Sequence, residues 1–380
     1  MPDNFLNIKF NDYGELRDLL IENYNRYINY KKFVNEIDDA TIVNENKNNF
    51  VIETYHYNDI ENINKINNSI VFIDTVTEGV HSINGFFNQY NKSNFYVIFS
   101  NSIWDKKQYD VGIDYINLDF WYFIQQTISD SANLYNENYH YSKEYNFDYP
   151  KNNIFVSTTG IKRPERTYLI DNLIEKINYD NFVLKYQGEN LGKNYDHCDF
   201  YKTTAENFNA YNTIFGNFVS ISALVPTKLY NQAYFNLVME TDIDYPYSFF
   251  PTEKIGKALL TGIPFVVYST PNFLQNLHNL GFKTYNELWN EDYDTEFEYT
   301  KRADKIINLC NHLENFDWQA NKEKLQQIAN HNAALMLKNK DIFIAQFEKI
   351  RLALEIIKDK DAQYFKNNPQ LFEWLDNSLI

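Results

Sequence analysis

Three consecutive side chains, at Thr252, Glu253 and Lys254, are the clearest candidates for chemistry. The apolar spacing after them predicts a helix over residues 253–260, with Thr252 as its N-cap and Gly262 at its end. The start of a helix offers N–H groups and a partial positive charge, which suit phosphate. Lys254 would add a full charge, and Glu253 can accept hydrogen bonds from two ribose hydroxyls. An ordinary capped helix with solvated side chains fits the same pattern.

A second predicted helix start carries two of the six arginines of the chain, Arg163 and Arg166. They lie between a predicted strand at 153–157 and a predicted helix at 166–177. The guanidinium group is a planar fork of donors that matches pyrophosphate oxygens. Arg166 is the first choice for a phosphate contact and Arg163 is the near alternative, while a solvated helix start would explain both.

Two acids, Asp242 and Asp244, follow the predicted strand at 235–240. Carboxylates at this spacing can hold a divalent cation against a diphosphate. The same triplet recurs at 292–294, and an acidic chain produces such triplets by chance. We therefore expect no metal here.

In the N-terminal half, a predicted strand at 69–74 runs into a loop with titratable side chains. The carboxyl ends of parallel strands are where ligand sites gather in α/β proteins. Glu78 is the best candidate for a general base, with Asp74 and His81 as alternatives. A helix-capping acid and a surface histidine would explain the same residues.

These side chains depend on strands that alternate with helical stretches, which predicts α/β architecture with parallel sheets. The polar, aromatic segment 133–153 predicts a boundary between two domains. We expect an N-terminal α/β domain at 1–145, a C-terminal α/β domain at 150–350 and a helical tail at 351–380. A short apolar run at 50–52 opens a region of compact apolar segments. The predicted strands are 69–74, 95–100, 153–157, 182–186, 235–240 and 264–268, and helical patterns cover 4–36, 166–177, 253–260 and much of 299–358.

Composition excludes several classes of protein. The chain has 380 residues, and 35 Lys and Arg against 51 Asp and Glu give a net charge of −16. Such an acidic surface repels phosphate backbones, so nucleic acid is an improbable partner. There is no apolar run of about 18 residues and no secretory signal pattern, so we expect a cytoplasmic protein without membrane insertion. Two cysteines cannot form a disulfide framework, and no Gly-rich phosphate loop occurs.

Taken in order, residues 236–241, 250–254 and 262–267 resemble the donor-binding half of GT-B glycosyltransferases. The nearest likeness is to the α1,3-fucosyltransferase family, with its Phe-Glu-Asn-Ser block, its Tyr-x-Thr-Glu-Lys block and its Gly-x-x-Pro-Val-Val strand. The resemblance covers about residues 150–350. It implies a GT-B-like fold, with two Rossmann-like α/β domains facing a cleft and a helical C-terminal segment.

The resemblance also implies an activity. A sugar would pass with inversion from a nucleotide-sugar, with a fucose-like GDP-sugar favoured, to a hydroxyl of a glycan or small-molecule acceptor, with no required metal or cofactor. The N-domain base would be Glu78, by analogy with the Glu that the family uses. The donor would contact Arg163, Arg166, Glu240, Thr252, Glu253 and Lys254.

Two departures leave the base and the sugar of the donor open. Phe250 stands where the family has Tyr, and Thr241 stands where it has Asn. Three alternatives remain: a sugar- or nucleotide-binding module without turnover, a viral-type transferase that glycosylates hydroxylated DNA bases, and a GT-A enzyme that holds its metal with Asp242 and Asp244.

Overall fold

The structure is a computed structural model. It describes four strands in the N-terminal half and most of the chain between residues 145 and 338. The chain divides into two compact units, which we describe separately. The described residues are 51–54, 70–74, 95–99, 115–118, 145–159, 163–177, 182–186, 189–192, 230–244 and 249–338, with 344, 348 and 351.

One unit contains a four-stranded parallel sheet in the order β1-β2-β3-β4. The strands are β1 (Val51–Thr54), β2 (Ile70–Asp74), β3 (Phe95–Phe99) and β4 (Tyr115–Leu118). The predicted strands at 69–74 and 95–100 are confirmed as β2 and β3, which pair in parallel with Ile70 opposite Phe95. The strand β4 was not predicted, because four residues interrupted by a polar Asn117 give no clear pattern.

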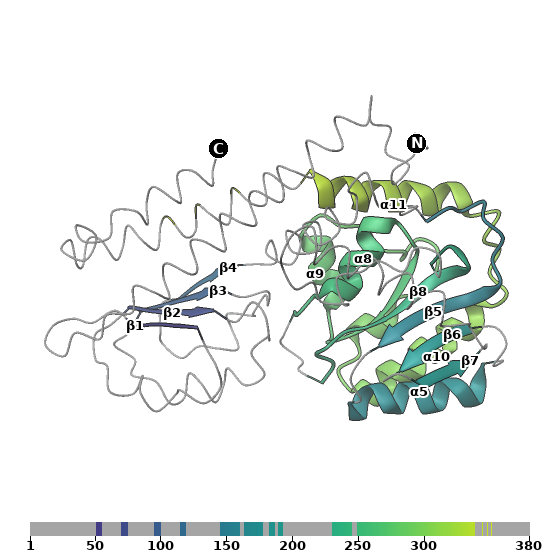
Figure 1. Cartoon of the computed structure of the whole chain (residues 1–380), viewed down its shortest axis with the longest axis horizontal. Helices are drawn as coiled ribbons and strands as arrows, with labels where there is room; N and C mark the ends of the chain where they lie inside the picture. Colours follow the sequence, from purple (N-terminus) through teal and green to yellow (C-terminus); the bar gives the residue numbers. More distant parts are fainter. Residues whose placement is uncertain are drawn as a thin grey trace, which may run out of the picture. The chain divides into compact units, whose positions relative to one another are not determined.

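The other unit contains a five-stranded sheet in the order β7-β6-β5-β8-β9 (Figure 1). Its strands are β5 (Asn153–Thr159), β6 (Phe182–Tyr186), β7 (Glu189–Gly192), β8 (Ala233–Met239) and β9 (Phe265–Tyr268). All neighbours pair in parallel except β7, which runs antiparallel to β6. Both described units are therefore α/β or parallel-sheet in character, as the alternation of strand and helix patterns predicts.

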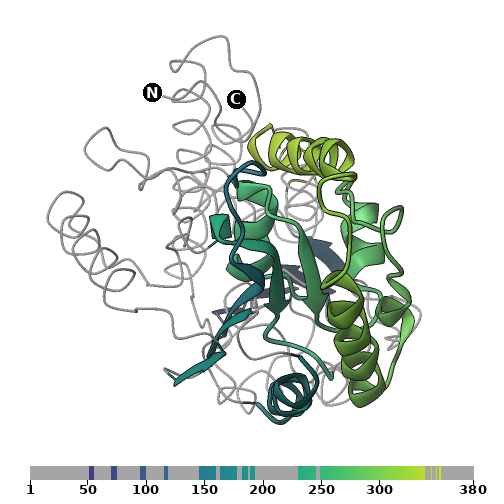
Figure 2. The ribbon, with the colours of Figure 1, turned by 90° about the vertical axis from the view of Figure 1, so that its right-hand side faces the viewer.

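The helices of this unit cover both faces of the sheet. The helix α5 (Pro164–Lys176) leads from β5 to β6, and α8 (Glu253–Thr261) leads from β8 to β9 in the opposite direction along the sheet. Since such crossovers are right-handed, opposite directions place the two helices on opposite faces. Figures 1 and 2 show this arrangement, with α5 below the strands and α11 (Lys322–Leu337) above them.

Two later helices complete the layers. The helix α10 (Tyr299–Leu313) packs against α5, and α11 packs against α8. A short helix, α9 (Phe273–Asn279), and a 3₁₀ turn, η4 (Asp292–Thr295), lie between β9 and α10. In the part of the chain that the structure describes, no helix combines the length and the apolar character needed to cross a bilayer.

The core of the sheet is aromatic. The rings of Phe155 and Phe182 stack with centroids 5.0 Å apart, and Phe235 lies on the other side of Phe155 at 5.6 Å. Tyr145 already belongs to this unit, because its buried hydroxyl donates to the carbonyl oxygens of Ala233 and Tyr234. The strand β8 thus pairs with β5 on one side and with β9 on the other, and Tyr145 bonds to its start. These contacts position the residues that follow β8.

Candidate functional site

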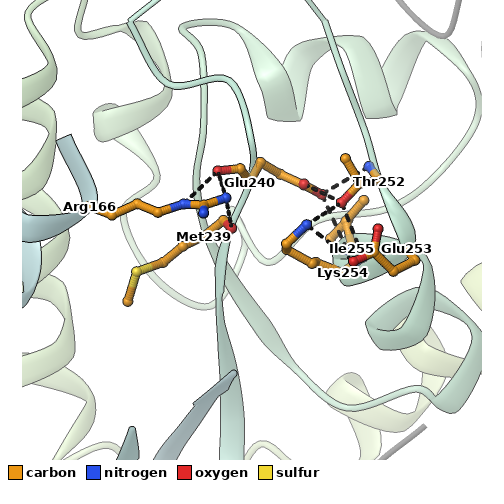
Figure 3. Close-up of polar contacts among 7 residues, drawn as sticks. All are labelled: Arg166, Met239, Glu240, Thr252, Glu253, Lys254 and Ile255. Carbon is orange, nitrogen blue, oxygen red and sulfur yellow. Dashed lines mark hydrogen bonds and ion pairs between the residues drawn. The ribbon is translucent and has the colours of Figure 1, made fainter. Parts of the chain in front are cut away.

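The candidate site lies where β5 and β8 stand side by side. Their parallel pairing brings their carboxyl ends to the same edge, and the chain leaves these ends in opposite directions, toward α5 and α8. Such a point, where the strand order reverses, opens a crevice in α/β sheets and commonly holds a ligand. Arg166 from α5, Glu240 after β8 and Thr252 before α8 meet here (Figure 3).

Arg166 ties α5 to the end of β8. Its Nε and Nη2 atoms donate to the carbonyl oxygen of Glu240 at 3.1 and 2.6 Å, and Nη2 also donates to the carbonyl oxygen of Met239 at 3.2 Å. The side chain is only 2% exposed. Two of its nitrogen atoms, Nε and Nη2, thus donate to the backbone. The predicted contact of Arg166 with phosphate stays a prediction.

Glu240 connects β8 to the start of α8. It is fully buried, and its Oε1 accepts hydrogen bonds from the backbone N–H of Thr252 at 3.1 Å and of Ile255 at 3.3 Å. Its Oε2 accepts the hydroxyl of Thr252 at 2.5 Å. Burial raises the pKa of Glu240 above its ordinary value, while the charge of Lys254 and the hydrogen bonds from Thr252 act in the opposite direction.

Hydrogen bonds within the protein therefore occupy most of the N–H groups at the start of α8. Thr252 is the N-cap, as predicted, and its Oγ1 accepts the N–H of Lys254 at 3.3 Å. Glu240 takes the N–H of Ile255, and the carbonyl oxygen of Thr252 takes the N–H of Gly256. A phosphate was expected to bind to free N–H groups at this helix start. Lys254 adds a partly exposed ammonium group there that can attract an anion.

Lys254 and Glu253 form a partly exposed ion pair. The Lys254 Nζ lies 3.2 Å from Glu253 Oε1 and donates to Thr252 Oγ1 at 3.1 Å (Figure 3). Their side chains are 19% and 26% exposed, so a ligand can reach both. Burial pushes the pKa of Glu253 upward, but the ammonium groups of Lys254 and Lys257 outweigh it, and this pKa lies below its ordinary value. Glu253 is thus a carboxylate at neutral pH.

Two further residues lie near the Glu253–Lys254 pair. Lys257, buried in α8, contributes positive charge to Glu253, and its position four residues later on the same helix was a readable signal. Burial raises the pKa of the Tyr230 phenol, and the nearby charge of Glu253 raises it further. Its hydroxyl accepts the side-chain amide of Asn236 at 3.2 Å. Nothing in the local sequence marks Tyr230, since it reaches the site through the fold.

The other candidates occupy the following positions. Arg163 is the N-cap of α5, with a half-exposed side chain that makes no capping hydrogen bond. Asp74 is the last residue of β2, in the other unit. Glu78 and His81 lie outside the described residues.

The two acids after β8 differ in their surroundings. Asp242 is buried and its carbonyl oxygen accepts the hydroxyl of Ser269, whereas Asp244 is exposed. Two carboxylates that share a cation need a common opening. Among the residues that the structure describes, no cluster of three or more His, Cys, Asp or Glu side chains could hold a metal ion.

Comparison with known proteins gives no relative: no protein-family model, no curated protein and no solved structure matches this chain. The function must therefore be inferred from the residues of the site and their geometry.

Proposed function

We propose that this protein is a GT-B-type glycosyltransferase. It would transfer a sugar, with inversion and without a required metal, from a nucleotide-sugar to a hydroxyl of a glycan or small-molecule acceptor, with a GDP-sugar as the favoured donor. The observation that carries the proposal is the Glu253–Lys254 pair, partly exposed at the point where the strand order of the sheet reverses. The order of the sequence blocks around it, which resembles the α1,3-fucosyltransferase donor half, points to the same donor class.

Each donor-side residue has a role in this proposal. The ammonium of Lys254 would bind the diphosphate and neutralise the charge that develops on it as it departs. The carboxylate of Glu253 would accept hydrogen bonds from ribose hydroxyls. Arg163 would be the second cation, because its half-buried side chain is more exposed than that of Arg166. Arg166 and Glu240 would hold the two helix starts in position.

The acceptor side rests on the sequence alone. As the acceptor oxygen attacks the anomeric carbon, Glu78 would take the proton from that hydroxyl. The bond from the sugar to the diphosphate breaks at the same time, and the nucleoside diphosphate leaves with its electron pair. A single base and a single displacement account for inversion.

A nucleotide panel tests the donor side. In thermal unfolding with GDP, UDP, ADP and CMP, one nucleotide should raise the unfolding temperature more than the others. A ligand at 100 times its dissociation constant adds about 2.7 kcal/mol to the free energy of unfolding. The variant Lys254→Ala should lose roughly 10- to 100-fold in affinity for the diphosphate, because a charged hydrogen bond contributes about 1.5–3 kcal/mol. Affinity for the bare nucleoside should change little.

The matched control is Lys305→Ala, which removes a lysine of α10 that forms ion pairs with Asp292 and Glu296. It should bind the diphosphate as the parent does. Equal affinity in the Lys254→Ala variant and the parent would refute the donor assignment. A second assay measures hydrolysis of the nucleotide-sugar that corresponds to the bound nucleotide. Slow hydrolysis would indicate an enzyme, and no hydrolysis would indicate a module that binds without turnover.

A further inference from the structure

A second group of polar and titratable side chains comes from α9, from the loop after it and from the residue that caps η4. The Nε2 atom of His278 and the Oγ1 atom of Thr284 are 2.8 Å apart. The hydroxyl of Thr284 donates to Glu291 Oε2 at 2.6 Å, and the N–H of Tyr285 donates to Glu291 Oε1 at 2.9 Å. Thr284 is 3% exposed, while His278 is half-buried. The three side chains form one continuous chain of hydrogen bonds.

The hydrogens of this chain can be counted. A threonine hydroxyl has one hydrogen to donate, and an ionised carboxylate only accepts. While Glu291 is ionised, Thr284 must donate to it, so Thr284 Oγ1 accepts from His278 and the imidazole carries its hydrogen on Nε2. When Glu291 binds a proton on Oε2, the carboxyl donates to Thr284. The hydroxyl hydrogen is then released to turn toward His278, and it can bond there only when Nε2 is bare and the ring hydrogen is on Nδ1.

The buried surroundings of Glu291 favour proton binding near neutral pH. Burial raises the pKa of Glu291 to about 7, against the hydrogen bonds from Thr284 and Tyr285, and the charge of Asp294 adds to the increase. Asp294 itself accepts the N–H groups of Leu274 and Gln275 at the start of α9.

The other titratable groups that interact with this acid pair have defined roles. Burial is the main reason why the pKa values of the Tyr285 and Tyr293 phenols are raised, and the charge of Glu291 raises both further. Arg302, on α10, acts on Asp294 rather than on Glu291. No cation therefore appears among the causes that set the pKa of Glu291, and its proton-bound form is accessible without disrupting an ion pair.

The order of the side chains argues against a catalytic triad. In a triad the imidazole lies between the nucleophile and the acid. Here the hydroxyl lies between the imidazole and the acid, and Thr284 is buried, so it cannot attack a substrate. What this order can do is transmit the protonation state of the acid to the ring.

We propose that the His278–Thr284–Glu291 chain is a proton-linked switch that sets the tautomer of His278. One proton from solvent binds Glu291, the Thr284 hydrogen rotates from the carboxyl to the imidazole, and the ring exchanges its Nε2 hydrogen with solvent for one on Nδ1. The ring gains and loses one hydrogen, so its charge is unchanged. Nδ1, which makes no hydrogen bond to the described residues, changes from acceptor to donor on the face of α9.

Histidine tautomers can be read directly by NMR of the full chain labelled with ¹⁵N-histidine, since the bare and the hydrogen-bearing ring nitrogens have well-separated shifts. The His278 signals are assigned from their loss in His278→Gln. At pH 8.5 the parent should show Nε2–H. In Glu291→Gln, the N–H of Tyr285 holds the amide oxygen and the amide NH₂ donates to Thr284. This variant should therefore show Nδ1–H at the same pH.

His331 is an internal control, because its Nε2 lies 2.7 Å from the carbonyl oxygen of Gly281, which only accepts. It should remain Nε2–H in every sample. The variant Thr284→Val removes the link, so adding Glu291→Gln to it should not alter the tautomer of His278. The same His278 tautomer in the parent and in Glu291→Gln would overturn the proposal, whether or not the valine variant folds. A tautomer change that persists without the Thr284 hydroxyl would overturn it too.

Discussion

Replacing Glu240 should destabilise the five-stranded unit more than any other change at the candidate site. In Glu240→Ala, the N–H group of the fully buried Ile255 and that of the half-buried Thr252 lose their acceptor. A buried polar group left without a partner costs about 1–3 kcal/mol. Two such groups, together with the stranded Thr252 hydroxyl, give an expected loss of about 3–5 kcal/mol in the free energy of unfolding. That is a large part of the roughly 5–15 kcal/mol that a domain usually has.

Urea denaturation followed by tryptophan fluorescence measures this loss, since Trp289 and Trp318 both lie in this unit. Glu240→Gln keeps one oxygen for the two N–H groups but turns an NH₂ group toward Thr252, so its expected cost is smaller, about 1–2 kcal/mol. The matched control is Glu253→Gln, an acid in the first turn of α8 that is partly exposed, which should cost less than about 1 kcal/mol.

The ranking of the three variants is what tests the reasoning. If Glu240→Ala unfolds within about 0.5 kcal/mol of the parent, the carboxylate does not hold the start of α8. If Glu253→Gln costs as much as Glu240→Ala, the effect comes from removing any acid near this helix, and the specific hydrogen bonds are not its cause.

Three further predictions concern other parts of the chain. Glu78→Gln should reduce transfer to the acceptor by roughly 10²–10⁴-fold with donor affinity unchanged, and normal transfer would exclude Glu78 as the base. Gly262→Ala should cost about 1–2 kcal/mol in urea denaturation, because Gly262 has φ 78° and a new Cβ would lie 3.0 Å from that of Ala329; an unchanged midpoint would contradict this. Because the pKa of Glu291 is about 7 in the folded chain against an ordinary 4.5, this group binds a proton on folding, so its own contribution to stability is full below pH 4.5 and falls by up to about 3 kcal/mol as the pH rises to 7. Glu291→Gln should flatten this decline, and a parallel pH profile in the variant would refute the assignment.

Local signals in the sequence were sufficient for the main elements of the second unit. The strand predicted at 182–186 is β6 with the same bounds, and the helix predicted at 253–260 is α8 to within one residue. Both ends of α8 are set by short-range chemistry, since Thr252 caps its start and Gly262 adopts the left-handed conformation at its end. Such features need no distant partner, so a single sequence reveals them.

Short strands escaped the same reasoning. The strand β7, Glu189–Gly192, has no apolar alternation, and it forms by pairing with β6, so that Leu191 stands opposite Leu184. Its neighbour provides the pattern that its own four residues lack. The two-domain GT-B arrangement and the base Glu78 remain predictions from the resemblance, because the described residues do not test them.

The sequence by itself determined the α/β character of the chain, the capped helix that carries Glu253 and Lys254, and the net charge of −16. Only the tertiary structure decided which side chains of the site are available to a ligand. Arg166 bonds to a carbonyl oxygen 74 residues away, and Glu240 occupies the N–H groups that a phosphate was expected to use. The physical reason is that a long polar side chain takes the nearest partner that packing brings to it, and that partner is set by the pairing of β5 with β8 rather than by any neighbour in the sequence.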